Sequence, residues 1–424
     1  MVSEAAASLW EALEDARRTT LRLIDGITEA QARQQPDPAF SPLAWHLGHV
    51  GWQEEVWALR AASGSAPIDP KLDRIFDSFR SEKSSRGARL PPIADLRSYL
   101  LHVRARTREV LERADPEGGG PLLRGGWVFH FLANHERQHA ETMAVVRLLG
   151  GWTLPHLPPM RSGRRPDPAF IPIDGGSFPL GCDDDPESWD NERCAHSVEL
   201  RAYGIGMFPV TNGEWLEFME AGGYSEDRFW SQEGRLWRSA NGITAPLHWV
   251  RAGDGWERRT LAGPRPVDPS HPVAHVSWFE ADAFARFAGA RLPTEAEWER
   301  AASWDEASGR KWRWPWGDGL ADEANLDLKN GDTTPCAPNQ RSPSGALQLG
   351  GDVWEWTSTP FGPYPGFRAD PYRGYSEPWF GDEHRVLRGG CHLTHPMNAR
   401  ASFRNWFHPG MRAIPSGLRL ARDG

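Results

Sequence analysis

His135 and His139 stand four residues apart in the stretch HERQH. Four residues make just over one helical turn, so both imidazoles would lie on one helix face and could bind one metal ion. The stretch also matches H-E-x-x-H, which in zinc peptidases supplies two ligands and a glutamate base. The alternative is an exposed or core histidine pair without a ligand. The surrounding residues are apolar and indicate burial, which is costly for imidazoles without partners and favours the metal.

A zinc peptidase would need a third protein ligand after the pair. The extended motif H-E-x-x-H-x-x-G fails, because Thr142 stands where the glycine is needed. Residues 142–166 contain no Asp or Glu, so a downstream carboxylate ligand is also missing. The sequence therefore argues against a peptidase.

A third histidine is available in WHLGH, which holds His46 and His49. Residues three apart diverge by about 60° around a helix, so we expect only one of them to face the interior. Three histidines leave open coordination positions on a metal, and imidazole suits Fe, Zn, Cu and Ni alike.

The helices that must carry these histidines are predicted by apolar residues at three- and four-residue intervals. They are expected at residues 3–27, 41–62, 93–114 and 125–151, with Ser41 as the N-cap of the second. Four helices, with a long connection between the second and third, predict a four-helix bundle over residues 1–153. Such bundles build metal sites from facing helices.

The pattern changes after the fourth helix. Residues 154–168 are rich in proline and arginine, lack periodicity and are predicted to be a linker. Residues 169–424 show short strands and Gly/Pro/Asn turns, with helices indicated at 277–290 and 294–303. This half is predicted to be an α+β domain with many loops.

Composition excludes several classes of protein. Hydrophobic residues make up 39% and charged residues 25%, with a net charge of −9, as in ordinary globular proteins. The absence of a basic stripe argues against nucleic acid as a partner. No apolar run reaches the roughly 18 residues needed to cross a membrane, and no signal peptide is evident, so we expect a cytoplasmic protein. The sequence makes no prediction of oligomeric state.

Long segments of the chain resemble a known enzyme family, the sulfoxide synthases of ergothioneine biosynthesis. SPLAWHLGHVGWQEEVW and NHERQHAETM resemble their DinB-like bundle domain. The second half resembles their formylglycine-generating-enzyme-like domain, a C-type-lectin-like fold. The segments that carry this are FIPIDGGSFPLG, FPVTNGEWLEFMEAGGY, HPVAHVSWFEADAFARFAGARLPTEAEWERAA, WPWGD, GDVWEWTSTPF, RVLRGG and GLRLAR.

The resemblance implies a non-haem iron(II) centre (Fe2+) held by His49, His135 and His139. It implies hercynine, the trimethylated betaine of histidine, as a substrate whose imidazole binds the iron. O2 then drives attachment of a chalcogen to C2 of that ring. Gln138 matches a family residue that helps to hold the hercynine carboxylate.

The second domain is expected to complete the substrate pocket. In the segment FRNW, Asn405 matches a residue that can donate to the carboxylate, and Trp406 one that faces the quaternary ammonium through cation–π attraction. Core packing is the other interpretation of Trp406. Tyr372 and Tyr375 match a Tyr-x-x-Tyr pair, one as a proton donor and the other as a wall for the trimethylammonium. Nearby Tyr364 is an alternative.

The chain also departs from both families. Formylglycine-generating enzymes use a cysteine pair after RGG, whereas here only Cys391 follows, and we expect it to fill a core position. Synthases that use γ-glutamylcysteine grip it with an Asp and an Arg after the Asn-Trp pair. Here Phe407 and Met411 stand at those positions, and the arginine is lost or displaced to Arg412. Burying a substrate's charge without a partner is costly, so γ-glutamylcysteine is not the expected co-substrate.

The selenoneine synthases resemble these enzymes and join hercynine to a selenosugar. A neutral sugar needs apolar walls rather than a charged clamp, so we expect this activity. Three alternatives remain: a sulfoxide synthase acting on a thiol such as cysteine or γ-glutamylcysteine, a metal-free ligand-binding module, and a DinB-type thiol transferase that needs no O2.

Overall fold

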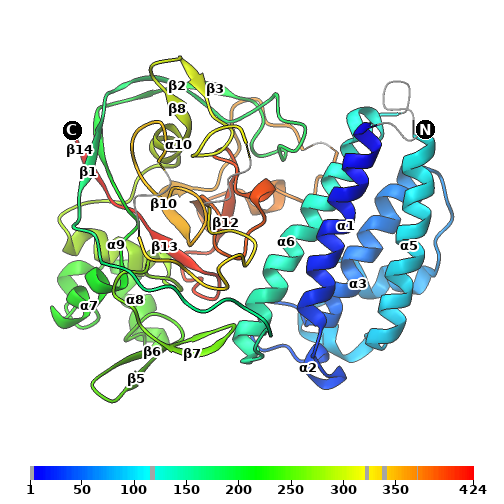
Figure 1. The fold of residues 1–424 in the computed structure, drawn as a ribbon, viewed down its shortest axis with the longest axis horizontal. Helices are drawn as coiled ribbons and strands as arrows, with labels where there is room; N and C mark the ends of the chain where they lie inside the picture. The colour runs from blue at the N-terminus through cyan, green and yellow to red at the C-terminus, as the bar shows by residue number, and fades with distance from the viewer. Residues whose placement is uncertain (1–3, 115–119, 320–323, 337–340, 370) are drawn as a thin grey trace. The chain divides into compact units, whose positions relative to one another are not determined.

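The computed structural model describes residues 4–114, 120–319, 324–336, 341–369 and 371–424 (Figure 1). The chain forms two compact units, which end and begin at Leu154 and Pro155. The first unit is helical, whereas the second combines short strands, helices and loops. Each unit is described by itself below.

Four long helices dominate the first unit: α1 (Glu4–Ile24), α3 (Leu43–Glu54), α5 (Ile93–Arg113) and α6 (Trp127–Gly150). They lie side by side in Figure 1, with α1 packed on α6, and α3 packed on both α5 and α6. The predicted helical bundle is thus confirmed. Its shorter segments are α2 (Glu29–Arg33), the π-helix η1 (Glu55–Ala61), η2 (Pro70–Leu72), α4 (Asp73–Phe76), η3 (Lys83–Arg89) and η4 (Arg124–Gly126).

The start of α3 differs from the prediction. Pro42 is the N-cap residue and forms no side-chain cap, so Ser41 is not the cap. Instead, the Ser41 hydroxyl is buried and accepts a hydrogen bond from Nη1 of Arg86 at 2.7 Å. The hydroxyl is used to bind a distant segment rather than its own helix.

A buried cluster of four charges joins all four long helices. Arg17 on α1 donates to Glu136 on α6 at 2.6 Å and to Glu54 on α3 at 2.8 Å. Arg104 on α5 donates to the same two carboxylates, at 2.8 Å to Glu54 and 3.1 Å to Glu136. All four side chains are more than nine-tenths buried. Each buried carboxylate is therefore held by two guanidinium groups, which satisfies its charge and its hydrogen bonds.

The second unit is built on small sheets. The largest has the order β12 (Asn405–Phe407), β11 (Arg385–Arg388), β10 (Trp354–Pro360) and β13 (Ser416–Leu418), in which β10 is antiparallel to β11 and parallel to β13. A second sheet has the order β1 (Phe170–Ile173), β4 (Tyr203–Gly206) and β14 (Ala421–Asp423). The remaining strands are β2 (Gly176–Leu180) with β3 (His196–Leu200), β5 (Trp249–Ala252) with β6 (Gly255–Thr260) and β7 (Gly263–Pro266), and β8 (Trp304–Asp305) with β9 (Arg310–Lys311).

The described part of this unit has four α-helices, two more than the sequence analysis indicated. The expected ones are α9 (Trp278–Phe287) and α10 (Glu295–Ser303), and the additional ones are α7 (Asn212–Glu220) and α8 (Gln232–Asn241). The capping box of α7, formed by Thr211 and Glu214, is a signal that the sequence carried. Short 3-10 turns are η5 (Asp227–Phe229), η6 (Glu377–Trp379) and η7 (Pro396–Asn398). Over the described residues, no helix has both the length and the apolar character needed to cross a membrane.

The charge cluster predicts a specific loss of stability. Arg104→Met should lower the free energy of unfolding by roughly 3–5 kcal/mol, because Arg17 alone cannot neutralise two buried carboxylates. Arg108→Met is the matched control, since Arg108 on the same helix forms an exposed pair with Glu112 and otherwise lies over the ring of Trp10. The free energy of unfolding of this control should fall by less than about 1 kcal/mol. Urea unfolding followed by helical circular dichroism measures both changes, and an equally small loss in both would contradict the prediction.

The same variant should change the pH dependence of stability. Burial by itself would raise the pKa of Glu54, but Arg104 and Arg17 outweigh it and hold the pKa below the usual 4.5. A carboxyl whose pKa is lower in the folded state contributes stability above its unfolded pKa, and that stability is lost as pH falls through the folded pKa. Wild-type protein should therefore lose stability as pH falls below about 4.5, and Arg104→Met should lose less over that range.

Candidate metal centre

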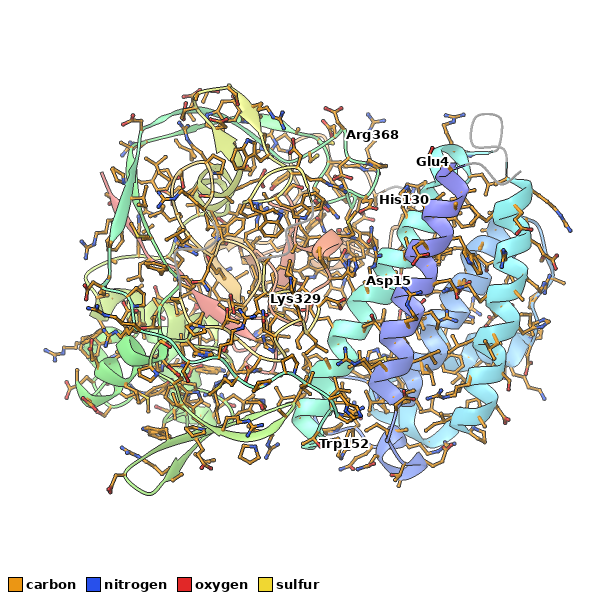
Figure 2. All side chains as sticks on the ribbon, viewed as in Figure 1. Glu4, Asp15, His130, Trp152, Lys329 and Arg368 are labelled. Carbon is orange, nitrogen blue, oxygen red and sulfur yellow. The ribbon has the colours of Figure 1, made fainter. Side chains whose placement is uncertain are left out.

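The three histidines proposed as ligands lie together in the first unit. His49 projects from α3, and His135 and His139 project from one face of α6. Their candidate ligand atoms all lie within 4.8 Å of one another. The ring centroids are 4.5 Å apart for His135 and His139, and 4.7 Å apart for His49 and His139. Among the described residues, these three form the group of His, Cys, Asp or Glu side chains that lies close enough together to share an ion. His130, which Figure 2 labels, also lies on α6 but does not belong to this group.

Burial keeps these imidazoles uncharged. His49 and His135 are 3% and 6% exposed, and His139 is partly buried. Loss of solvent lowers the pKa of all three well below 6.5, and neighbouring histidines act in the same direction. A neutral imidazole retains a nitrogen lone pair, which is the form that binds metals. Three such donors on two facing helices fit a divalent transition-metal ion with open positions.

His49 is held by the groups around it. Its Nδ1 atom lies 2.7 Å from the carbonyl oxygen of Phe76, the last residue of α4. Its ring stacks on Trp45, with centroids 4.4 Å apart and planes 16° from parallel. The guanidinium of Arg86 lies over Trp45 at 4.0 Å. Because Nδ1 is engaged by the carbonyl, Nε2 is the nitrogen available to a metal.

His46 also lies at this group, which corrects the expectation that only one histidine of α3 faces the interior. It is 4% exposed, and its Nδ1 lies 2.9 Å from Nδ1 of His139. Burial first, and then the charges of Arg86 and Lys83, lower the pKa of His46 to about 3, whereas the carbonyl of Ser41 opposes them. The 60° divergence along α3 does not separate His46 from the group, because the facing histidine on α6 reaches it.

Glu136 does not act as it would in a zinc peptidase. This glutamate of the HERQH segment binds the buried guanidinium groups of Arg17 and Arg104. Both oxygens of this carboxylate accept hydrogen bonds from the two arginines, so Glu136 is engaged in structure rather than offered to a water on a metal. The rejection of the peptidase hypothesis therefore has a structural reason beyond the missing third ligand.

Two of the predicted residues of the second unit meet in an aromatic group. Trp406 in β12 stacks on Phe361, with centroids 4.3 Å apart and planes 3° from parallel. The ring of Tyr375 meets Trp406 edge-on at 5.3 Å and stacks on Trp189 at 3.8 Å. Trp189 and Phe361 were not predicted, because no motif in the sequence distinguishes them from core aromatics. One face of Trp406 is thus covered by Phe361.

The other tyrosines differ in their surroundings. Tyr372 lies in the same turn as Tyr375, whose amide donates to the Tyr372 carbonyl at 3.2 Å. Tyr364 is 5% exposed, and its hydroxyl accepts a hydrogen bond from Arg388 at 3.2 Å. Arg404 lies over the ring of Tyr364 at 4.1 Å. Tyr364 is therefore a core residue, whereas Tyr372 and Tyr375 are only partly buried.

The segment after Trp406 lacks a free charged pair. Phe407 and Met411 are partly buried. Arg412 is occupied, because its Nε lies 3.0 Å from Oε2 of Glu280 and its Nη2 donates to the carbonyl of Ala245. Part of the Arg412 guanidinium is therefore engaged within the second unit.

The remaining predicted residues are placed as follows. Gln138 is partly buried on α6, between His135 and His139 in sequence, and belongs to the first unit. Asn405 is partly buried in β12 of the second unit, and its Oδ1 accepts from the amide of Trp406 at 2.9 Å. Cys391 is fully buried with a free thiol, as expected of a core residue.

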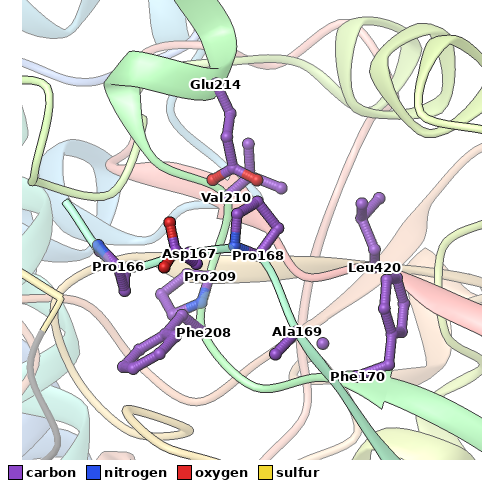
Figure 3. Close-up of a pocket in the computed structure, with 11 residues that line it drawn as sticks. Pro166, Asp167, Pro168, Ala169, Phe170, Phe208, Pro209, Val210, Glu214 and Leu420 are labelled. Carbon is purple, nitrogen blue, oxygen red and sulfur yellow. The ribbon is translucent and has the colours of Figure 1, made fainter.

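A small pocket lies elsewhere in the second unit (Figure 3). Its cavity volume is about 30 Å³, and none of the predicted site residues line it. The end of the predicted linker, Pro166 to Pro168, forms one wall with Asp167 between the prolines. The rest of the lining is Ala169, Phe170, Gly206, Phe208, Pro209, Val210, Glu214 and Leu420.

Two family matches fall on either side of the boundary between the two units. Residues 12–143 match the DinB superfamily, and residues 158–424 match the sulfatase-modifying factor enzyme 1-like domain. The chain is 42% identical to a hercynine oxygenase of Mycolicibacterium thermoresistibile, over 98% of this chain and 95% of that protein. It is 41% identical to a hercynine oxygenase of Mycolicibacterium smegmatis, over 99% of both chains.

The chain belongs to the hercynine oxygenase family. It is accordingly an enzyme, an oxidoreductase, and not a ligand-binding module. Its second half is also 33% identical to a formylglycine-generating enzyme of Thermomonospora curvata, which covers 62% of this chain and 97% of that protein. That partial match agrees with the fold of the second unit, which the sequence analysis anticipated.

The geometry predicts the metal content of five variants. His49→Ala, His135→Ala and His139→Ala should each lose stoichiometric metal, because two remaining imidazoles bind a divalent ion weakly. His46→Ala should retain metal with lower affinity, and His102→Ala, an exposed change on α5, should match wild type. Elemental analysis of the dialysed proteins gives the metal per chain. Full metal in His49→Ala combined with none in His46→Ala would exchange the assignments of these two histidines.

Proposed function

We propose that the protein is an iron(II)- and O2-dependent enzyme that joins selenium from a selenosugar to C2 of the hercynine imidazole. The family match supports hercynine as substrate, since the full-length relatives bear the name hercynine oxygenase. The buried group of His49, His135 and His139 supports a metal. The residues after Trp406 support the choice of co-substrate.

Iron(II) suits the proposed ligands. Three neutral imidazoles contribute no charge, so the ion would keep its full 2+ charge and attract an anionic selenolate or thiolate. When bound, the ion would supply a Lewis-acidic and redox-active centre to which the hercynine imidazole, O2 and the chalcogen have access. The protein's part is to hold three imidazoles in place and to keep them neutral through burial.

The other proposed residues recognise the two charged ends of hercynine. Gln138 and Asn405 carry amides that can donate to its carboxylate. Trp406 and Tyr375 offer aromatic surface for its trimethylammonium, an attraction worth roughly 0.5–2 kcal/mol per ring. Tyr372 and Tyr375 lie in one turn and each carries a hydroxyl, so one of the two is the proposed proton donor and the other a wall for the trimethylammonium.

The co-substrate proposal rests on the ion pair between Arg412 and Glu280. A clamp for γ-glutamylcysteine needs one negative and one positive side chain, and Phe407 and Met411 supply neither. Drawing Arg412 into the place of the missing arginine would weaken its pair with Glu280, a buried carboxylate that would then have less charge compensation. A neutral selenosugar requires no such partner. The alternative, sulfoxide formation with a thiol such as cysteine or γ-glutamylcysteine, is favoured by the names of the relatives.

Hercynine should bind better than histidine, because only hercynine carries a fixed trimethylammonium. Trp406→Ala should weaken hercynine binding by about 2- to 30-fold, the equivalent of 0.5–2 kcal/mol. Trp379→Ala is the matched control, since Trp379 is 44% exposed in the same unit. Calorimetric titration of the iron-loaded protein without O2 measures the dissociation constants. Equal affinities for histidine and hercynine would rule out the role of the aromatic group.

Co-substrate choice is tested by reconstituting the enzyme with Fe(II) without oxygen. Hercynine is then added with O2 and equal amounts of selenosugar, γ-glutamylcysteine and cysteine. Mass spectrometry should show a selenium-bearing hercynine product that forms only with O2 and far faster than either sulfur product. The double variant Phe407→Asp with Met411→Arg should shift activity towards γ-glutamylcysteine, because it restores both charges. Wild-type enzyme that uses γ-glutamylcysteine as fast as the selenosugar would assign it to sulfoxide formation.

A further inference from the structure

The contact between His46 and His139 can form with either ring as the hydrogen-bond donor, whereas the contact between His49 and Phe76 cannot. The carbonyl of Phe76 can only accept a hydrogen bond, so Nδ1 of His49 must carry its proton. The partner of His139 is another imidazole, whose Nδ1 can donate or accept. The protonated nitrogen of His49 is thus set by the backbone, whereas that of His139 depends on a side chain.

Two arrangements of protons satisfy the 2.9 Å contact. A neutral imidazole carries a single proton, so within this contact one Nδ1 must donate while the other accepts. If His46 donates, the proton of His139 lies on Nε2, and that nitrogen has no lone pair for a metal. If His139 donates, its Nε2 is a free ligand and His46 carries its own proton on Nε2.

We propose that His46 is a positioning residue, which accepts a hydrogen bond from Nδ1 of His139 and so keeps Nε2 of His139 free to bind the metal. Carboxylates and backbone carbonyls commonly play this part beside metal-binding histidines, and they also orient the ring. Here a neutral imidazole does so. The inference rests on the proposed metal centre and adds a role for a residue outside the ligand group.

The need for a free Nε2 on His139, rather than a partner for His46, sets this direction. Within the described part of the chain, Nε2 of His46 is buried and has no hydrogen-bond partner. A proton on that nitrogen would be an unsatisfied buried donor, a cost that metal binding at Nε2 of His139 must offset. The edge contact with Trp45 at 5.4 Å holds the His46 ring from another side.

The proton positions can be observed without measuring enzyme activity. Zinc, which is diamagnetic, replaces iron in protein labelled with ¹⁵N in its histidines, and nitrogen–proton correlation spectra identify the protonated nitrogen of each ring. We expect the proton on Nδ1 of His139 and on Nε2 of His46. A proton on Nδ1 of His46 in the zinc-loaded protein would overturn the proposal.

Two substitutions separate hydrogen bonding from packing. His46→Leu fills the space but accepts no hydrogen bond, and it should weaken zinc binding by roughly 10- to 100-fold. His46→Asn places an amide oxygen near the position of Nδ1 and should recover most of that loss. His102→Leu, on the exposed face of α5, is the control and should bind as wild type does. Chelator competition gives the affinities, and thermal unfolding of the metal-free proteins reports on folding.

The outcomes distinguish this inference from the proposed function. Wild-type protein that binds neither zinc nor iron at the three histidines would refute the metal centre itself. Normal metal binding in a folded His46→Leu protein, or equal losses in the Leu and Asn variants, would refute only the role of His46. If His46→Leu does not fold, the wild-type spectra and the Asn variant still decide the question.

Discussion

The candidate site depends on keeping several imidazoles uncharged inside a helical bundle. A buried imidazole loses the hydration that stabilises its charged form, so its pKa falls and its lone pair stays available. Burial also removes water as a hydrogen-bond partner, so the protein must supply one for the nitrogen that does not face the metal. For His49 this partner is the carbonyl of Phe76, and for His139 it is His46. Burial, which would keep these imidazoles able to bind a metal, therefore also requires a hydrogen-bond partner beside the ring.

The buried cluster of Arg17, Glu54, Arg104 and Glu136 helps to hold the helices that carry the histidines. Glu136 follows His135 directly on α6, and successive residues of a helix point about 100° apart. When Arg17 and Arg104 hold Glu136, they restrict rotation of α6 about its axis and thus limit where His135 can point. Glu54 restricts α3, which carries His49, in the same way. The cluster links the helices that carry the ligands to α1 and α5, which carry none of the three.

The sequence predicted the bundle because its helices are long, periodic and bounded by glycine or proline, and the i, i+4 rule placed His135 and His139 together. It could not reveal the partner of His49, because a backbone carbonyl carries no residue identity and Phe76 lies 27 residues further along the chain. It assigned Glu136 to a familiar motif because the two arginines that bind this carboxylate lie on other helices. The prediction for His46 and His49 considered only the angle between them on α3, whereas the surroundings of His46 also depend on His139 of the facing helix α6. In the second unit, the short helices α7 and α8 were missed because their apolar faces span too few turns to show periodicity.

Two sets of paired charges near the candidate sites have the same consequence for chemistry. The carboxylate of Glu136 is engaged by Arg17 and Arg104, and the guanidinium of Arg412 is paired with Glu280. In both cases a residue type that suggests function in the sequence is used for structure, because a buried charge without a partner is costly. Under the proposed function, the effect on co-substrate choice would be mainly one of exclusion. Side chains such as Phe407 and Met411 would gain little from a sugar, but they would give nothing to the ammonium and carboxylate groups of a peptide-like thiol, which would lose their water without compensation. Selection between co-substrates would then arise because charged co-substrates bind unfavourably, and it would persist even if the neutral selenosugar bound weakly.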